Sequence, residues 1–310
     1  MRAFLLCVLL LAGCRTQGTK VIGVVPKATS HLFFVSVHEG VKQAAKDFGV
    51  QVEWNGPNEE TGHSRQIQIV DAMVTRRVDA LAISATDERA LAGPVERAIR
   101  AGIPVTVFDS GVNVEDYVQF VATGNYAAGC SAARRLAALI GGKGKVAMVM
   151  HKPGGTSTML REQGFEETVA KEFPGIQIAG RQFGMSDAAR SRAAAENLLT
   201  AHPDLAGMFA SSEASSLGAI SALKSRKAKV RLITFDTSDQ HVEALGEGLI
   251  DVMMVQDSYR IGYEAVKSLA EKLKGGTPVK RIDIPAREIT REDLDKPGVR
   301  ELLSPMSRAR

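Results

Sequence analysis

Short apolar runs alternate along the chain with longer segments in which apolar residues recur at helical spacing. The runs at 20–25, 78–84 and 103–110 are apolar on both faces, which is typical of parallel strands buried on both sides. In the segment 37–48 the apolar residues recur every three or four positions, and the pattern stops at Gly49, as at a helix end. The alternation predicts strand, helix, strand, helix and strand.

This order of elements occurs twice. The strand end VTVFDSG at 105–111 returns as LITFDTS at 232–238, and Gly40 and Asp79 match Gly164 and Asp204 at a nearly constant offset. The strands predicted in the second half lie at 145–150, 176–180, 205–211 and 230–237. The sequence therefore predicts an α/β protein with two doubly wound parallel sheets, one in each lobe.

Both copies place an aspartate at the carboxyl end of a strand. Ligands of open parallel sheets bind beyond these ends, so Asp109 and Asp236 are expected to face one cleft between the lobes. A carboxylate accepts two O–H donors and suits a vicinal diol, although a cap on the next helix or turn is the alternative for either residue. Gln256 ends a third apolar run, VMMVQ, and offers both a donor and an acceptor to a hydroxyl.

Two adjacent aromatic residues follow the first strand. On a helix Phe33 and Phe34 point about 100° apart, so both cannot face one core stripe. We expect an aromatic face that stacks on a sugar ring, with two core residues as the alternative. His31 is either a hydrogen-bonding rim residue or an exposed loop histidine.

The first fourteen residues are expected to be a processing signal. Arg2 precedes an apolar stretch at 3–10 and the run Leu-Ala-Gly-Cys at 11–14, which resembles a bacterial lipobox. The apolar stretch is too short to span a hydrocarbon core of about 30 Å. We expect residues 1–14 to be a lipoprotein signal peptide that ends at a lipidated Cys14; a plain secretory signal is the alternative. Cys130 then remains alone in the body of the protein, so no internal disulfide is expected.

Composition and motifs favour a carrier over an enzyme. The chain has 310 residues, a length that suggests two domains, and its formal charge of +4 forms no basic stripe for nucleic acid. It carries no G-x-S-x-G, H-E-x-x-H or C-x-x-C motif and no dinucleotide fingerprint, and its six histidines lack metal-ligand spacing. We expect no catalytic residue, no metal and no cofactor.

The segments FFVSVHEG, AGIPVTVFDS, NLLTAHPDLAGMFAS, LITFDTS and VMMVQDSYRIG resemble, in order and spacing, those of the ribose-type periplasmic sugar-binding proteins. These are the substrate-binding components of ABC importers. The resemblance implies two lobes joined by three hinge crossings, near Thr123-Gly124-Asn125, after Gln256 and near Pro285. It places 19–123 with 257–284 in the N-terminal lobe, and 125–255 with 285–310 in the C-terminal lobe.

The resemblance also implies a pocket. Phe33 and Phe34 match the family's ring-stacking aromatics, and Asp109, Asp236 and Gln256 match its hydroxyl-binding groups. His31 stands where an amide is usual. The family's second pocket arginine falls on Met159 without a gap in the alignment, or near Arg161 with one. The remaining expected pocket residues are serines that stand where the family has longer or aromatic side chains: Ser84, Ser110, Ser186 and Ser212. These shorter residues predict a roomier pocket for a hexose, a polyol or a modified sugar.

The sequence thus predicts a monomeric, lipid-anchored solute-binding protein of the periplasm or cell envelope. It captures a small sugar or polyol and delivers it to an ABC permease; its membrane contact is the lipid alone. The alternative is a sugar-sensing receptor component that docks on a chemoreceptor or a histidine kinase. A cationic ligand is a weaker alternative, because Lys27, Arg161 and Arg260 are available to neutralise the acidic residues.

Overall fold

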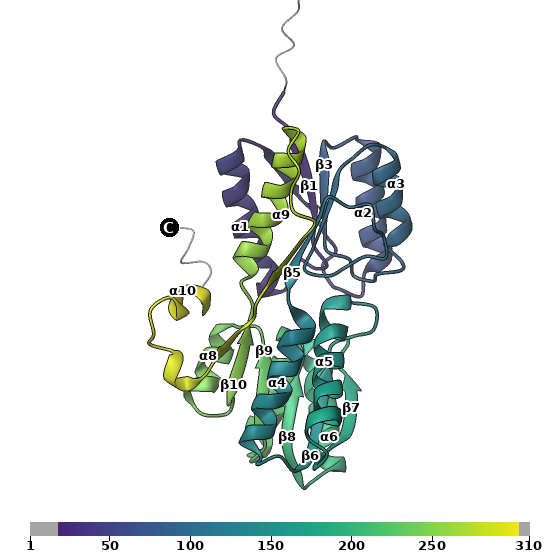
Figure 1. Ribbon diagram of the computed structural model, residues 1–310. Coiled ribbons are helices and arrows are strands. Elements are labelled where there is room, and N and C mark those ends of the chain that lie inside the picture. The colour runs from purple at the N-terminus through teal and green to yellow at the C-terminus, as the bar shows by residue number, and fades with distance from the viewer. Residues whose placement is uncertain (1–17, 304–310) are drawn as a thin grey trace, which may run out of the picture.

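The computed structural model describes residues 18–303, which form two α/β lobes placed end to end (Figure 1). The N-terminal lobe contains β1 (Val21–Val25), α1 (Leu32–Phe48), β2 (Gln51–Trp54), α2 (His63–Thr75), β3 (Ala80–Ile83), α3 (Ala92–Arg100), β4 (Val105–Phe108), β5 (Gln119–Thr123), α9 (Ser258–Leu273) and β11 (Arg281–Ile284). The C-terminal lobe contains α4 (Asn125–Leu139), β6 (Gly144–Met150), α5 (Thr156–Glu172), β7 (Ile176–Phe183), α6 (Ala188–Ala201), β8 (Leu205–Ala210), α7 (Glu213–Arg226), β9 (Arg231–Phe235), α8 (Asp239–Gly246), β10 (Val252–Val255), β12 (Arg287–Ile289), a 3-10 helix (Arg291–Asp293) and α10 (Val299–Leu303).

The two sheets have the same strand order. The first is β2-β1-β3-β4-β5-β11 and the second is β7-β6-β8-β9-β10-β12. All neighbours are parallel except β12, which runs antiparallel to β10. Strands β6 to β10 therefore repeat the places of β1 to β5. The fold class that the duplicated sequence pattern predicts is confirmed.

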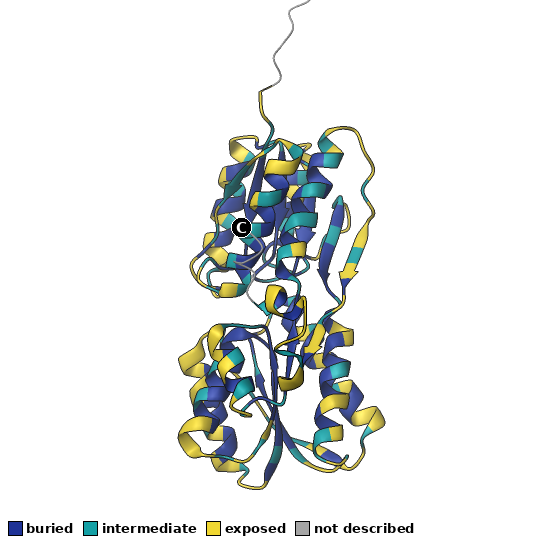
Figure 2. Cartoon of the chain, turned by 90° about the vertical axis from the view of Figure 1, so that its left-hand side faces the viewer, coloured by how far each residue is buried: buried dark blue, intermediate teal, exposed yellow. Residues whose placement is uncertain are grey.

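Each sheet is buried on both faces, as its apolar strands require. In β3, Ala80 and Ala82 pack in the cluster below α1 and α9, whereas Leu81 and Ile83 pack in the cluster on the opposite face. Successive side chains of a strand point to opposite faces, so a strand covered by helices on both sides needs a continuous apolar run. Figure 2 shows these buried strands inside each lobe, with the exposed positions on the outer helices.

The chain passes between the sheets three times. It leaves the first lobe between β5 and α4, returns between β10 and α9, and crosses again between β11 and β12. The hydroxyl of Thr123, at the first crossing, donates to Gln256 Oε1 at the second, over 2.6 Å. The helix that follows each of the first two crossings takes the same place in its new lobe: α4 packs on α5 and α9 packs on α1.

These two helix pairs approach closely through glycines. A Cβ atom on Gly40 of α1 would collide with the carbonyl oxygen of Tyr259 in α9, and one on Gly262 would collide with that of Val37. In the second lobe Gly129 and Gly164 face backbone carbonyls in the same way across α4 and α5. The duplicated pair Gly40 and Gly164 is thus explained by packing.

Two findings bear on the N-terminal region and membrane contact. No helix within 18–303 is long and apolar enough to cross a bilayer. Cys14 lies outside the described residues.

A Gly40→Ala substitution should destabilise the N-terminal lobe by about 2 kcal/mol or more, because the added methyl forces α1 away from α9. Urea unfolding measures the loss. Gly246→Ala is the matched control, since a Cβ there meets nothing within 4 Å. Equal stability of the two variants would contradict this packing argument.

Candidate functional site

The two strand-end aspartates line one cavity between the lobes, which we call the central cavity. Asp109 follows β4 and Asp236 follows β9, so the two residues occupy equivalent places in the two sheets. Both adopt the left-handed conformation, with φ of 57° and 71°. Aspartate tolerates this conformation better than most residues do. The duplication therefore gives both half-sites a carboxylate on the same backbone conformation.

Asp109 is held by partners of its own lobe. The Ser84 hydroxyl donates to its Oδ2 over 2.8 Å, and Lys27 Nζ lies 3.2 Å from the same oxygen. Burial penalises the ammonium of Lys27, but the carboxylates of Asp109 and Glu60 outweigh this penalty and raise the pKa of Lys27. The first half-site is therefore a buried ion pair.

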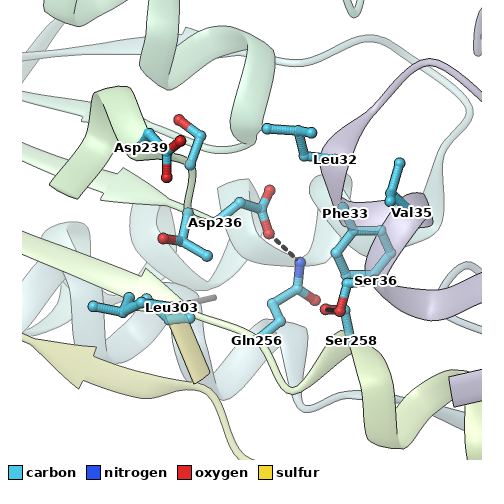
Figure 3. Close-up of a pocket in the computed structure, with 12 residues that line it drawn as sticks. Leu32, Phe33, Val35, Ser36, Asp236, Asp239, Gln256, Ser258 and Leu303 are labelled. Carbon is cyan, nitrogen blue, oxygen red and sulfur yellow. Dashed lines mark hydrogen bonds between the residues drawn. The ribbon is translucent and has the colours of Figure 1, made fainter. Parts of the chain in front are cut away.

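Asp236 is held mainly by uncharged donors. Gln256 Nε2 donates to Oδ1 over 2.5 Å (Figure 3), and the backbone N–H of Glu213 donates to Oδ2 over 2.9 Å. The guanidinium of Arg161 lies over the Phe235 ring at 3.9 Å, with Nη1 3.9 Å from Asp236 Oδ2. Burial lowers the pKa of Arg161, whereas Asp236 and Asp109 act in the opposite direction. Asp236 is thus positioned by donors that a ligand can supplement or replace.

A buried cluster around Glu60 joins the lobes. Its carboxylate lies 2.9 Å from Nε2 of His151, which comes from the other lobe, and 3.5 Å from Lys27 Nζ. Burial lowers the pKa of His151, although Glu60 acts in the opposite direction. The ring bridges two partners, since Nε2 pairs with Glu60 and Nδ1 lies 2.8 Å from the Ser212 hydroxyl. Burial would raise the pKa of Glu60, but Lys27 and His151 hold it well below its ordinary value.

His31 belongs to the same cluster. Its Nδ1 lies 3.4 Å from Glu60 Oε1. Burial disfavours its protonation, but the hydrogen bond and charge of Glu60 outweigh this and raise the pKa of His31. Its Nε2 lies 3.5 Å from the Ser186 hydroxyl of the other lobe. Of the two alternatives for His31, the structure favours the hydrogen-bonding one.

The start of α1 is capped from the other lobe. His31 occupies the N-cap position and makes no side-chain cap. Instead the Glu213 carboxylate accepts the N–H groups of Leu32 and Phe33 over 3.3 and 3.1 Å. Burial and the neighbouring Asp236 raise the pKa of Glu213. Because a helix start has unpaired N–H groups, closure of the lobes supplies the acceptor that α1 lacks.

The structure brings together most of the expected site residues. The lining of the central cavity includes His31, Phe33, Phe34, Asp109, Arg161, Ser212, Asp236 and Gln256. Phe34 also belongs to the core and is 1% exposed, while Phe33 is half-buried with its ring 5.0 Å from that of Phe34. The aromatic pair is therefore divided between core and cavity.

The other three expected residues do not line the central cavity. Ser84 is buried and donates to Asp109, and Ser186 lines a neighbouring hollow. Ser110 contacts Thr156 of the other lobe at 3.2 Å. With the lobes in this closed arrangement, the central cavity measures about 20 Å³, which is the space of one water.

Three buried side chains that were not predicted for the pocket contribute to this small volume. Lys27, Glu60 and His151 all line the central cavity. Lys27 and His151 come shortly after the ends of β1 and β6, so the strand-end rule that found the aspartates also points to them. Glu60 lies in the loop before α2, where no periodic pattern marks it.

The comparisons with known proteins identify the family of the chain. The family model for the periplasmic binding protein domain matches residues 22–277. The chain belongs to the periplasmic binding protein family. Its resemblance to the ribose-type members of this family is confirmed by a curated relative. This ribose import binding protein of Bacillus subtilis is 28% identical over 266 residues, which are 86% of each chain.

Solved structures place this periplasmic binding protein among carbohydrate-transport proteins. A solute-binding protein from Agrobacterium radiobacter, solved in complex with D-arabinose, is 30% identical, with a TM-score of 0.90, and the match covers 93% of this chain and all of that one. One from Agrobacterium vitis, bound to α-D-tagatopyranose, is 30% identical with a TM-score of 0.88, over 92% and 99% of the two chains. These relatives are described as import or transport proteins, which fits the expectation of a non-enzyme at the level of the family.

A buried glutamate, Glu162, holds the backbone at His151, a member of the cluster around Glu60. Glu162 Oε1 accepts the backbone N–H of His151 over 2.9 Å and the hydroxyl of Ser211 over 2.7 Å. Burial raises the pKa of Glu162 to about 7. The folded protein therefore holds a proton here that the unfolded chain releases near its ordinary pKa of 4.5. Stability from this group is complete below pH 4.5 and is lost as the pH rises towards 7.

A Glu162→Gln substitution keeps the acceptor oxygen and removes this titration. We compare the free energy of unfolding of the variant with that of the wild type at each pH. As the pH rises from 4.5 to 8, this difference should change by on the order of 3 kcal/mol in favour of the variant. Urea unfolding at the two pH values tests this. Glu96→Gln, at an exposed site, is the control and should stay within about 0.5 kcal/mol. An equal difference from wild type at both pH values would rule out the assignment.

Proposed function

We propose that this chain is the solute-binding component of an ABC sugar importer. The observation that carries the proposal is the cleft itself, in which the equivalent strand ends of two duplicated lobes present Asp109 and Asp236 to one cavity. The crystal structures of relatives with D-arabinose and α-D-tagatopyranose support a sugar as the ligand. The chain is exported, is anchored by lipid on Cys14 in the periplasm or cell envelope, acts as a monomer and delivers its ligand to the permease.

The ligand enters when the lobes separate. With a central cavity of about 20 Å³, a sugar ring has no room until contacts between the lobes open, among them Glu60 to His151 and Lys27 to Ser157. Sugar hydroxyls then donate to Asp236 and accept from Gln256, while the ring packs its C–H groups on the half-buried Phe33. The lobes close around the bound ring.

Affinity in this scheme is moderate. Each neutral hydrogen bond contributes a net of about 1 kcal/mol, and bonds to a carboxylate contribute about 1.5 to 3 kcal/mol. Immobilisation of the sugar and the broken contacts between the lobes offset much of this gain. We therefore expect a dissociation constant in the micromolar range, which corresponds to a binding free energy of about −8 kcal/mol.

Calorimetry of the mature chain against pentoses, hexoses and polyols, including D-ribose, D-arabinose and D-tagatose, tests the proposal. At least one should bind with micromolar affinity. Asp236→Asn should weaken that sugar at least tenfold, because the amide loses one acceptor while asparagine still tolerates the left-handed backbone. Asp251→Asn, at the far end of β10, is the matched control. Absence of binding across the panel would refute the proposed function.

Closure makes a second prediction. Glu213→Ala removes the acceptor for two N–H groups only in the closed form, because water satisfies them in the open one. The dissociation constant of the bound sugar should rise about tenfold, mainly through a faster off-rate measured by stopped flow. Glu39→Ala, whose partner Lys42 lies on the same helix, should leave the off-rate unchanged. An unaltered off-rate in Glu213→Ala would exclude a closing role for this contact.

A further inference from the structure

A second hollow between the lobes adjoins the central cavity, and we call it the side cavity. Phe33, Asp236 and Gln256 belong to the walls of both, so the two spaces meet at these residues. The side cavity measures about 320 Å³, against about 20 Å³ for the central one. Figure 3 shows it between α1 on one side and the β9–α8 connection and Leu303 on the other. The side cavity is therefore the larger of the two spaces that share Phe33, Asp236 and Gln256.

The walls of the side cavity come from both lobes, and their exposed surface is mainly apolar, although Ser238 and Asp239 also line it. Leu32 and Val35 of α1 lie on one side and Leu303 of α10 on the other (Figure 3). Val255 of β10 also lines the cavity. Leu32 is 50% exposed, so the cavity stays open to solvent on this side. Such a lining suits an apolar group of phenyl size rather than a second set of sugar hydroxyls.

The polar groups of the side cavity are mostly used already. Gln256 donates to Asp236, and the hydroxyls of Ser36 and Ser258 bond to each other over 2.6 Å. Thr237 differs, because its Oγ1 is buried and has no hydrogen-bond partner among the described residues. This oxygen is closed off from the cavity space, so the surface that remains for an occupant is mainly apolar.

We propose that the physiological ligand is a glycoside: a sugar whose ring is bound at Asp236, Gln256 and Phe33 and whose apolar aglycone occupies the side cavity. The inference rests on the proposed function and adds the class of ligand. Because α1 and α10 belong to different lobes, an aglycone between them contacts both only when the lobes are closed. The aglycone thereby favours the closed form.

Calorimetry with the wild-type chain decides the question. The probes are the methyl and phenyl glycosides of whichever sugars bind in the panel above. The phenyl glycoside should bind at least tenfold more tightly than the methyl glycoside. A ratio near one, or weaker binding of the phenyl glycoside, overturns the inference while leaving the proposed function intact. Failure of every sugar and glycoside to bind overturns both.

Variants of the cavity wall test its location. Val35→Trp fills the side cavity and should reduce the phenyl-to-methyl ratio to within about twofold of one. Val279→Trp, at a valine that is 62% exposed outside both cavities, is the matched control and should keep the full ratio. Val35→Ala, a milder change that does not depend on fitting a large ring, should lower the ratio about threefold. A full ratio in both Val35 variants would place the aglycone elsewhere and overturn the inference.

Discussion

A charge removed from water needs a partner, and this requirement governs the cleft. Glu60 pairs with His151, and the carboxylate of Glu213 reaches the helix start of the opposite lobe. Lys27 is paired within its lobe and also donates to Ser157 across the cleft. Isolated buried charges are costly, so the closed arrangement is possible because the two lobes satisfy each other's groups. The two lobes behave as complementary halves of one polar core.

The two half-sites have diverged in chemistry although their backbones match. Asp109 is neutralised by Lys27, whereas Asp236 keeps Gln256 and a backbone N–H as its close donors. A bound hydroxyl can replace a neutral donor more easily than it can replace a buried ammonium. The asymmetry favours ligand recognition on the side of Asp236, which also lines the side cavity.

The fold can be predicted from the sequence more completely than the geometry of the site. A repeated strand–helix order is enough to predict two parallel sheets, and the strand-end rule correctly brings Asp109, Asp236 and Gln256 to one cavity. The size of the cavity was not predictable in this way. Short serines indicate room only if no neighbour fills it, and Glu60 arrives from a loop without periodicity. Its contact with His151 spans two lobes, so it depends on packing rather than on local pattern.

The late return of α9 to the first lobe has a consequence for how the chain folds during synthesis. The apolar cluster under α1 includes Ile261, Leu269 and Ile284, residues that leave the ribosome long after the rest of that lobe. The second lobe likewise takes Val299 and Leu302 into its interior. Neither lobe can complete its core until these late segments have been synthesised. Until then the nascent chain stays incompletely folded, a condition that suits passage across a membrane before folding.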